Sequence, residues 1–301
     1  MSVFVKSLAA AATALALTAS AGVAHAGGVD ITAQQPNAPV NLDRIDQLTG
    51  TDSVYTYPDS AGAGVTIYVI DTGGRITHDD FGSRASGDTD CNGHGTHAGS
   101  VAAGAEYGVA KRAELVFISV LNCNGGGTVA DVIAAVNQVT TDAAQRPGRA
   151  VALMELGGAA NTAVDTAVTQ SIASGVPYVV TAGNDNADAC AFSPARVTTA
   201  LTVGGTDQAG TVTTPSGNWG PCVDIYAPDR DITAAWHTGD SAVATLSGTG
   251  AAAHVAGALA LYLSLHPDAT PGEAGGALLS NAGTVMSASG PVPFLYTGFM
   301  N

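Results

Sequence analysis

The chain has 301 residues, of which 46% are hydrophobic and 12% are charged, and it contains 38 glycines. This composition is typical of a packed globular domain and excludes a disordered chain. Ten basic residues against 25 acidic ones give a formal net charge of −15, which argues against a nucleic-acid partner and favours a soluble secreted protein.

Residues 1–26 have the pattern of a secretory signal peptide. Lys6 precedes an Ala/Leu-rich run, and the small-residue sequence AHA ends at Ala26. The apolar core of this run is too short for a membrane anchor. We therefore expect a secreted, extracellular protein with no membrane association after signal removal. Residues 27–41 are polar and predict an irregular lead-in, followed by one domain over residues 42–301, which leaves no room for a propeptide.

Apolar runs bounded by glycine alternate with helical segments along this domain. Alternation of this kind predicts an α/β fold, doubly wound, with a mostly parallel sheet and helices on both faces. We expect strands over residues 65–70, 115–120, 150–154, 178–182, 200–203 and 223–227. We expect helices over residues 97–103, 129–144, 163–174, 251–264 and 273–280.

Two chemically active residues follow the first predicted strand. Asp71 ends the apolar run, and His94 lies in DCNGHGTH, residues 90–97, where the next helical segment begins. The carboxyl ends of strands in an open parallel sheet carry the functional groups. The sequence therefore predicts that Asp71 and His94 lie at one edge of the sheet.

Seven motifs in a fixed order cover residues 42 to about 280. They are LDRIDQ (42–47), YVIDTG (68–73), DCNGHGTH (90–97), YGVAK (107–111), VLNCNGGGT (120–128), TAGNDNADAC (181–190) and HVAGALALYL (254–263). On these motifs the chain resembles the subtilisin-like serine proteases, most closely the proteinase K and aqualysin branch. The resemblance implies a subtilisin-like domain that hydrolyses polypeptides with an Asp/His/Ser triad, and we expect a monomer.

The resemblance also assigns roles to individual residues. His94 would accept the proton of the nucleophile, and Asp71 would hold the imidazole in the correct tautomer. Asn184 would donate an amide N–H to the oxyanion of the tetrahedral intermediate. His97, His78 and His254 are interpreted as packing or hydrogen-bonding residues.

The substrate cleft is expected between two glycine-rich segments. A peptide would add as an antiparallel strand along one wall, and the other wall would lie opposite. The first wall is Gly125, Gly126 and Gly127, and the second is Leu156, Gly157 and Gly158. Glu155 stands where the family usually has a serine, which places a carboxylate at or near the groove.

The segment that should supply the nucleophile departs from the family pattern. The family has GTSMATPHVAG, whereas this chain has GTGAAAHVAG over residues 248–257, which is one residue shorter. The nucleophile position falls on Gly250 when the motif is aligned from its N-terminal side and on Thr249 when it is aligned back from HVAG; Ser247 aligns with neither. We therefore expect an endopeptidase with impaired activity; the alternative is a non-catalytic homologue that binds peptides in the old cleft.

A second departure lies between Asp71 and His94. This span is several residues shorter than in the aqualysin-like relatives, and we expect a strand-like piece after Ala85 to be missing.

Four cysteines fit an oxidising compartment and allow three pairings. The resemblance favours Cys91 with Cys123 and Cys190 with Cys222, and each pair stands 32 residues apart. The resemblance also implies structural calcium, whose ligands are oxygen atoms. The first site would use Thr198, Ala200 and Asp224. A second site would use Asp43, Asp46, Gln47 and Asp52, for which a solvated acidic surface is the alternative.

Overall fold

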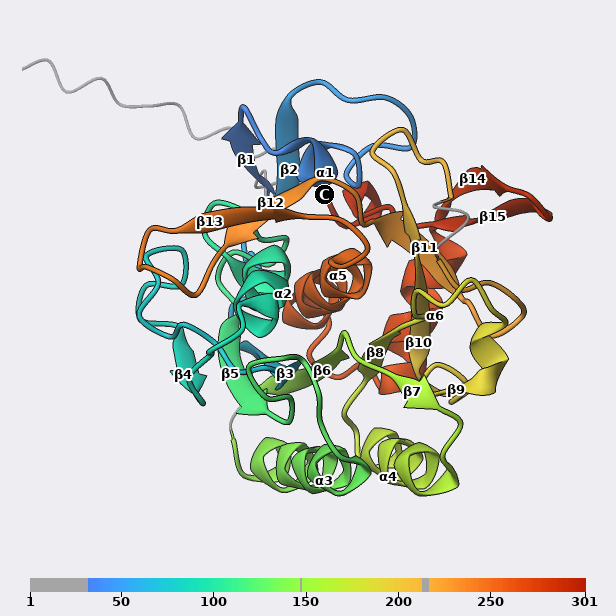
Figure 1. Ribbon diagram of the computed structural model, residues 1–301. Coiled ribbons are helices and arrows are strands. Elements are labelled where there is room, and N and C mark those ends of the chain that lie inside the picture. The colour runs from blue at the N-terminus through green and yellow to red at the C-terminus, as the bar shows by residue number, and fades with distance from the viewer. Residues whose placement is uncertain (1–31, 147, 213–216) are drawn as a thin grey trace, which may run out of the picture. The chain divides into compact units, whose positions relative to one another are not determined.

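The computed structural model describes residues 32–146, 148–212 and 217–301 (Figure 1). The predicted signal peptide and the first part of the predicted lead-in lie outside these residues. Residues 62–301 supply the sheet and helices that place the candidate site, and residues 32–58 add a two-stranded sheet and a short helix.

A nine-stranded sheet forms the centre of residues 62–301, with strand order β14-β15-β11-β10-β8-β6-β3-β5-β4. Every neighbouring pair is parallel except β14 with β15. The strands are β3 (Val65–Asp71), β4 (Ala85–Gly87), β5 (Glu114–Ser119), β6 (Arg149–Met154), β8 (Tyr178–Thr181), β10 (Leu201–Thr206), β11 (Ile225–Pro228), β14 (Gly283–Ser287) and β15 (Gly290–Phe294). All seven residues of β3 are buried, as expected for a central strand covered on both faces.

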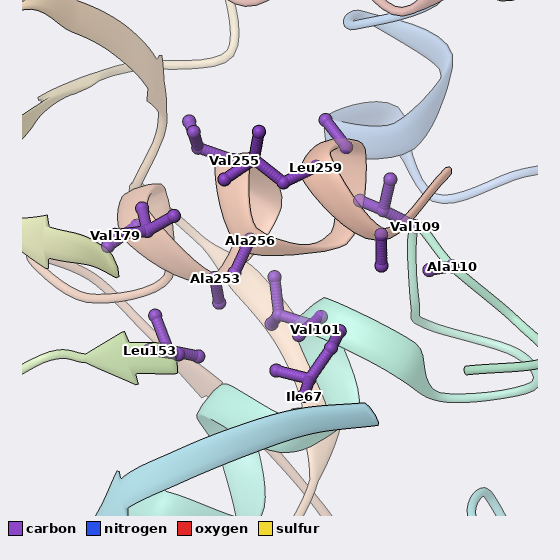
Figure 2. Packing of buried hydrophobic residues seen from close by; sticks show 14 of the residues in the cluster. Ile67, Val101, Val109, Ala110, Leu153, Val179, Ala253, Val255, Ala256 and Leu259 are labelled. Carbon is purple, nitrogen blue, oxygen red and sulfur yellow. The ribbon is translucent and has the colours of Figure 1, made fainter. Parts of the chain in front are cut away.

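Helices cover both faces of the sheet (Figure 1). Helices α2 (His94–Ala103), α5 (Ala251–Leu265) and α6 (Pro271–Ser280) share a hydrophobic core with one face. Helices α3 (Val129–Gln145) and α4 (Thr162–Ala173) share a second core with the other face. Figure 2 shows part of the first core, in which side chains from the sheet, α2 and α5 meet, among them Ile67, Val101 and Ala256. This doubly wound α/β arrangement confirms the predicted fold class.

The smaller elements form three two-stranded sheets and short helical turns. Antiparallel pairs join β1 (Thr32–Pro36) with β2 (Val54–Pro58), β7 (Gly158–Ala159) with β9 (Phe192–Ser193), and β12 (Ile232–Ala235) with β13 (Val243–Leu246). The helix α1 spans Val40–Asp43, and 3₁₀ turns span Ala189–Ala191 and Gly298–Met300. None of the described helices is long and apolar enough to cross a membrane.

Two sequence-based expectations are wrong. The lead-in is not irregular throughout, because Thr32–Pro36 pairs with β2 in an antiparallel sheet. The polar side chains of this segment do not predict a strand, since its pairing with β2 depends on backbone groups. A strand-like piece is present after Asp71, because Ala85–Gly87 forms β4 and pairs in parallel with β5. Strand β4 is three residues long and lies at the sheet edge, so it carries no apolar alternation.

Both disulfides join the cysteines that the resemblance paired. Cys91 is bonded to Cys123, and Cys190 is bonded to Cys222. The first bridge links the loop before α2 to the loop after β5, next to the residues of the candidate site.

Candidate active site

Asp71 is fixed at the carboxyl end of the central strand β3. Its carbonyl accepts hydrogen bonds from the backbone N–H groups of Val120 and Leu121, just beyond β5. Its carboxylate is fully buried and accepts a hydrogen bond from Thr72 N at 2.7 Å. A buried carboxylate is tolerated only where hydrogen-bond donors and a cation surround it. The remaining partner of Asp71 is His94, the first residue of α2.

Side chains from the loop before α2 and from the turn after β3 hold the start of α2 against Asp71. The Asp90 carboxylate accepts from the backbone N–H of Gly93 and of Thr96, which are free donors of the first helical turn. Thr72 Oγ1 accepts from Gly95 N. A Cβ at Gly95 would lie 2.2 Å from the Gly73 carbonyl oxygen, so only glycine permits this approach of the helix to the turn.

His94 and Asp71 form a paired imidazole and carboxylate. His94 Nδ1 lies 2.8 and 2.9 Å from the two carboxylate oxygens of Asp71. Burial disfavours the imidazolium, but the charge and hydrogen bond of Asp71 outweigh this effect. With smaller contributions from Glu155 and Asp90, the net result is to raise the pKa of His94 to about 9.

Thr249 lies on the other side of the imidazole. Its hydroxyl oxygen is 3.0 Å from His94 Nε2 and donates to Glu155 Oε2 at 2.5 Å. A hydroxyl has one proton, so the bond to His94 must be donated by the ring. Both ring nitrogens then carry protons, which agrees with the raised pKa of His94. Gly250 has no side chain to offer, so of the two positions suggested by the motif, only Thr249 brings a hydroxyl to His94.

Gly250 has a structural role at the start of α5. It is the N-cap residue, with φ of 105°, a conformation that side chains rarely adopt. Ser247, which neither alignment selected, donates to Asp231 and accepts from its backbone N–H.

Glu155 fills the space in front of the first turn of α5. Its carboxylate accepts from Gly250 N at 2.9 and 3.0 Å and from Ala253 N at 2.9 Å, in addition to the Thr249 hydroxyl. A carboxylate is stabilised there by the unpaired N–H groups and the positive end of the helix dipole. The sequence predicted a carboxylate at or near the groove from Glu155, which lines the cleft, but did not predict its hydrogen bonds to the start of α5.

Asn184, the predicted oxyanion donor, follows β8 at the same edge. Its side-chain amide Nδ2 donates to the Gly248 carbonyl at 2.6 Å. Asn184 and Thr249 line one hollow of about 360 Å³ with His94 and Glu155. The side chain therefore faces the candidate site, with one of its N–H groups directed to the chain that leads into α5.

The two predicted walls line a continuous groove. A cleft of about 530 Å³ is lined by Gly125, Gly126 and Gly127 on one side and by Leu156, Gly157 and Gly158 on the other. The second wall continues into the hollow beside Asn184. The first wall is a turn rather than an open edge at Gly126, because the carbonyl of that residue accepts from Asn122 N.

The three histidines predicted to be packing or hydrogen-bonding residues are all hydrogen-bonded. His97 Nε2 bonds to the Ile232 carbonyl, and His254 bonds to the Gly250 carbonyl and the Asn41 side chain. Burial lowers the pKa of His97 and of His254 to about 4 in each case, so both are neutral at neutral pH. His78 bonds to the Ala242 carbonyl and to the backbone of Asp80.

Residues 62–294 match the Peptidase S8 subtilase family. The chain belongs to the subtilase family. It is 46% identical over 283 residues to an extracellular serine proteinase of Thermus sp. (strain Rt41A), covering 89% of this chain and 68% of that protein. It is 43% identical over 268 residues to alkaline serine exoprotease A of Vibrio alginolyticus, covering 85% of this chain and 49% of that protein. The chain thus spans between about half and two thirds of the length of these relatives.

A solved structure supports the same assignment. The crystal structure of a cold adapted subtilisin-like serine proteinase aligns with a TM-score of 0.82 at 43% identity, covering 87% of this chain and 98% of that one. The subtilase fold therefore extends through the Asp71, His94 and Thr249 region described above.

The predicted calcium ligands lie in two separate places. Gln47 Nε2 and Asp52 N both donate to Asp43, which brings three members of the second set together. Asp46 Oδ1 is buried with no hydrogen-bond partner, and burial raises the pKa of Asp46 to about 7. Among the described residues, no group of three or more His, Cys, Asp or Glu side chains is arranged to hold a metal ion.

The first predicted set lies at the start of β10. The Asp224 carboxylate accepts from Thr202 N, two residues beyond Ala200, and burial raises the pKa of Asp224. Thr198 is exposed in the loop that precedes this strand. The atoms that these residues would offer to a metal ion are oxygens, which is the ligand type that calcium prefers.

Proposed function

We propose that this subtilase is a secreted endopeptidase with low turnover in which Thr249 has replaced the serine nucleophile. The observation that carries the proposal is the 3.0 Å contact of Thr249 Oγ1 with His94 Nε2, while His94 Nδ1 is paired with Asp71. This is the order of contacts that nucleophilic catalysis requires: a hydroxyl, a base within hydrogen-bond distance and a group that orients the base.

The reaction starts when neutral His94 takes the Thr249 proton and Thr249 Oγ1 attacks the carbonyl carbon of a peptide bound between the two glycine-rich walls. His94 then gives the proton to the leaving amine, which breaks the peptide bond and leaves a threonine ester. Water, deprotonated by His94, hydrolyses this ester, and Thr249 recovers its proton. Asp71 stabilises the imidazolium in both halves of the reaction.

Two features reduce the rate. With a pKa of about 9, only about 1% of His94 is neutral and able to act as a base at pH 7. The Thr249 hydroxyl also donates to Glu155 rather than to His94. A β-branched threonine is restricted about its first side-chain torsion, so turning this hydroxyl is harder than it is for serine.

A non-catalytic peptide-binding protein is the second candidate function. It is favoured by the Glu155 carboxylate, which accepts from Thr249, Gly250 and Ala253 at once. The groove would then bind extended polypeptides without cleaving them.

Hydrolysis of a fluorogenic peptide, beside His94→Ala and Gly250→Ser, separates the two functions. Each sample must first show a cooperative thermal melt. Slow turnover in the parent that disappears in His94→Ala supports the proposal, whereas a folded parent without turnover contradicts it and supports the binding protein. Turnover gained only in Gly250→Ser would show that the site lacks a competent nucleophile.

We also propose that calcium stabilises the fold, held by Asp43, Asp46, Gln47 and Asp52 and by the Thr198, Ala200 and Asp224 set. The buried, unpaired Asp46 Oδ1 supports the first of these sites. Because the folded-state pKa of Asp46 is raised from 3.8 to about 7, its contribution to stability without calcium decreases as the pH rises through this range. Calcium should reverse this trend by binding the ionised form. Thermal melts with calcium and with a chelator test this, and Asp46→Asn should reduce the calcium-dependent increase in Tm.

A further inference from the structure

The contacts of Glu155 at the candidate site are not explained by the proposed reaction. Glu155 follows β6, and its side chain crosses to the start of α5. Its two oxygens accept four hydrogen bonds from three residues there: Thr249, Gly250 and Ala253. A single interaction could be incidental, but a carboxylate bonded through both oxygens to a hydroxyl and two helix N–H groups occupies a defined anion position.

The same position is the one that a reacting carbonyl would need. Thr249 Oγ1 must lie against the carbonyl carbon, so the negative charge that develops on the carbonyl oxygen falls within bonding distance of donors around Thr249. Asn184 lines the same hollow, and its side-chain amide donates to Gly248 O. A negatively charged ligand group and the Glu155 carboxylate would compete for the same hydrogen-bond donors and would repel each other.

We propose that the Glu155 carboxylate is an internal occupant of the anion position at the start of α5, which keeps ligand carboxylates and the reaction's oxyanion out until its side chain turns away. Glu155 thereby selects which peptides the groove accepts. Segments that continue through the site as neutral amides are admitted, and peptides that end there in a carboxylate are rejected. This inference deepens the proposed function and rests on the groove being a peptide-binding cleft.

The cleft offers a matched control for the charge of Glu155. Asp185 lines the same hollow, and among the described residues its carboxylate has no hydrogen bond to the first turn of α5. Asp185→Asn removes one negative charge near the ligand without freeing Thr249, Gly250 or Ala253. Glu155→Ala removes one charge and frees all three donors. Glu155→Gln removes the charge and keeps the size.

The first experiment measures binding by isothermal titration calorimetry. The probes are acetyl-trialanine with a free C-terminal carboxylate and the same peptide with a C-terminal amide. The parent should bind the amide in preference. In Glu155→Ala, affinity for the carboxylate should rise about tenfold relative to the amide, because charge-assisted hydrogen bonds to the freed donors become available. A change in Glu155→Ala no larger than that in Asp185→Asn would overturn the inference.

The second experiment needs no peptide. Sodium acetate supplies a free carboxylate that matches the CH2–COO− fragment removed in Glu155→Ala. Compared with sodium chloride at the same ionic strength, acetate should raise the Tm of Glu155→Ala more than that of the parent or of Asp185→Asn. Equal responses of the three proteins would overturn the inference.

The outcomes separate this inference from the proposed function. Amide binding by the parent with no change of selectivity in Glu155→Ala keeps the peptide-binding cleft and removes the role of Glu155. If no folded variant binds either peptide, the cleft proposal fails, and the acetate measurement alone decides whether Glu155 fills an anion position. Turnover that falls, rather than rises, in Glu155→Ala would assign Glu155 to the reaction and contradict its role as an obstructing group.

Discussion

The two sides of the candidate site differ in how closely they follow the subtilase pattern. On the side formed by β3 and α2, Asp71 and His94 are paired as the family motifs imply, and Asp90, Thr72 and Gly95 fix the start of the helix. On the side formed by α5, Thr249 and Gly250 stand at the positions that align with the family's serine, and the Glu155 carboxylate accepts hydrogen bonds from Gly250 N and Ala253 N. The comparison teaches that the first turn of a buried helix requires a hydrogen-bond acceptor, and that the chain itself supplies it here.

The largest expected effect is the loss of turnover on the intact side. His94→Ala removes the imidazole that takes the Thr249 proton in the proposed reaction, so peptide hydrolysis should fall to background; loss of the corresponding histidine costs about 10⁶ in turnover in subtilisin. Initial rates with a fluorogenic peptide measure this. His266→Ala, at the far end of α5, serves as the control and should keep the parent rate. Equal rates in the parent and His94→Ala would remove His94 from the mechanism.

The two disulfides sharpen the comparison, because both close loops with a sequence separation of 32. Replacing either pair by alanine should lower the free energy of unfolding by roughly 3–4 kcal/mol on the chain-entropy model. Only the Cys91–Cys123 bridge adjoins Asn92, which donates to the Cys123 carbonyl and accepts from His94 N. Urea denaturation should therefore show similar losses, while turnover falls further in Cys91→Ala/Cys123→Ala. Equal turnover in the two double variants would contradict this link.

The pH dependence of turnover connects the two sides. In the proposed reaction His94 acts as a base in its neutral form, so kcat/KM should rise with pH through about 9. Because the Glu155 charge helps to raise this pKa, Glu155→Gln should move the rising limb to lower pH, and Asp185→Asn should move it less. Proton NMR of the His94 ring gives the same pKa without turnover. A limb that stays in place in Glu155→Gln would show that the two side chains are not electrostatically coupled.

The smallest expected effect concerns the stability of α5. Glu155→Ala leaves the Gly250 and Ala253 N–H groups to water and should lower the free energy of unfolding by about 1 kcal/mol. Thr270→Ala, which removes the capping box of α6, is a matched substitution with a loss of similar size. Urea denaturation of both variants measures the losses, and an unchanged or higher stability of Glu155→Ala would show that its contacts do not stabilise the helix.

The sequence predicted six of the nine strands of the central sheet, because these six are largely apolar runs; β14 and β15, at one end of the sheet, were not predicted. The run that forms β3 is largely apolar and ends at Asp71, which predicted that Asp71 and His94 lie at its carboxyl edge. Strands β1 and β4 were not predictable in this way, since β1 is polar and β4 has three residues, and both are formed by pairing with a distant strand.

The α5 side of the site was predictable only in part. The sequence motif aligned the nucleophile position with either Thr249 or Gly250. The spacing could not decide between these two residues, because a one-residue deletion rotates the start of a helix by about 100°. The choice came from the tertiary contact of Thr249 with His94. The Glu155 contacts join residues about 95 positions apart, and the only signal in the sequence was a glutamate where relatives have serine.

Covalent labelling tests the central claim, that Thr249 is the nucleophile, most directly. A fluorophosphonate forms a bond to an activated hydroxyl, and mass spectrometry of the digested protein locates the adduct. We expect slow labelling of Thr249 that is absent in His94→Ala and in Thr249→Val, and faster labelling in Thr249→Ser. An adduct on Ser247, or labelling that persists in Thr249→Val, would contradict it.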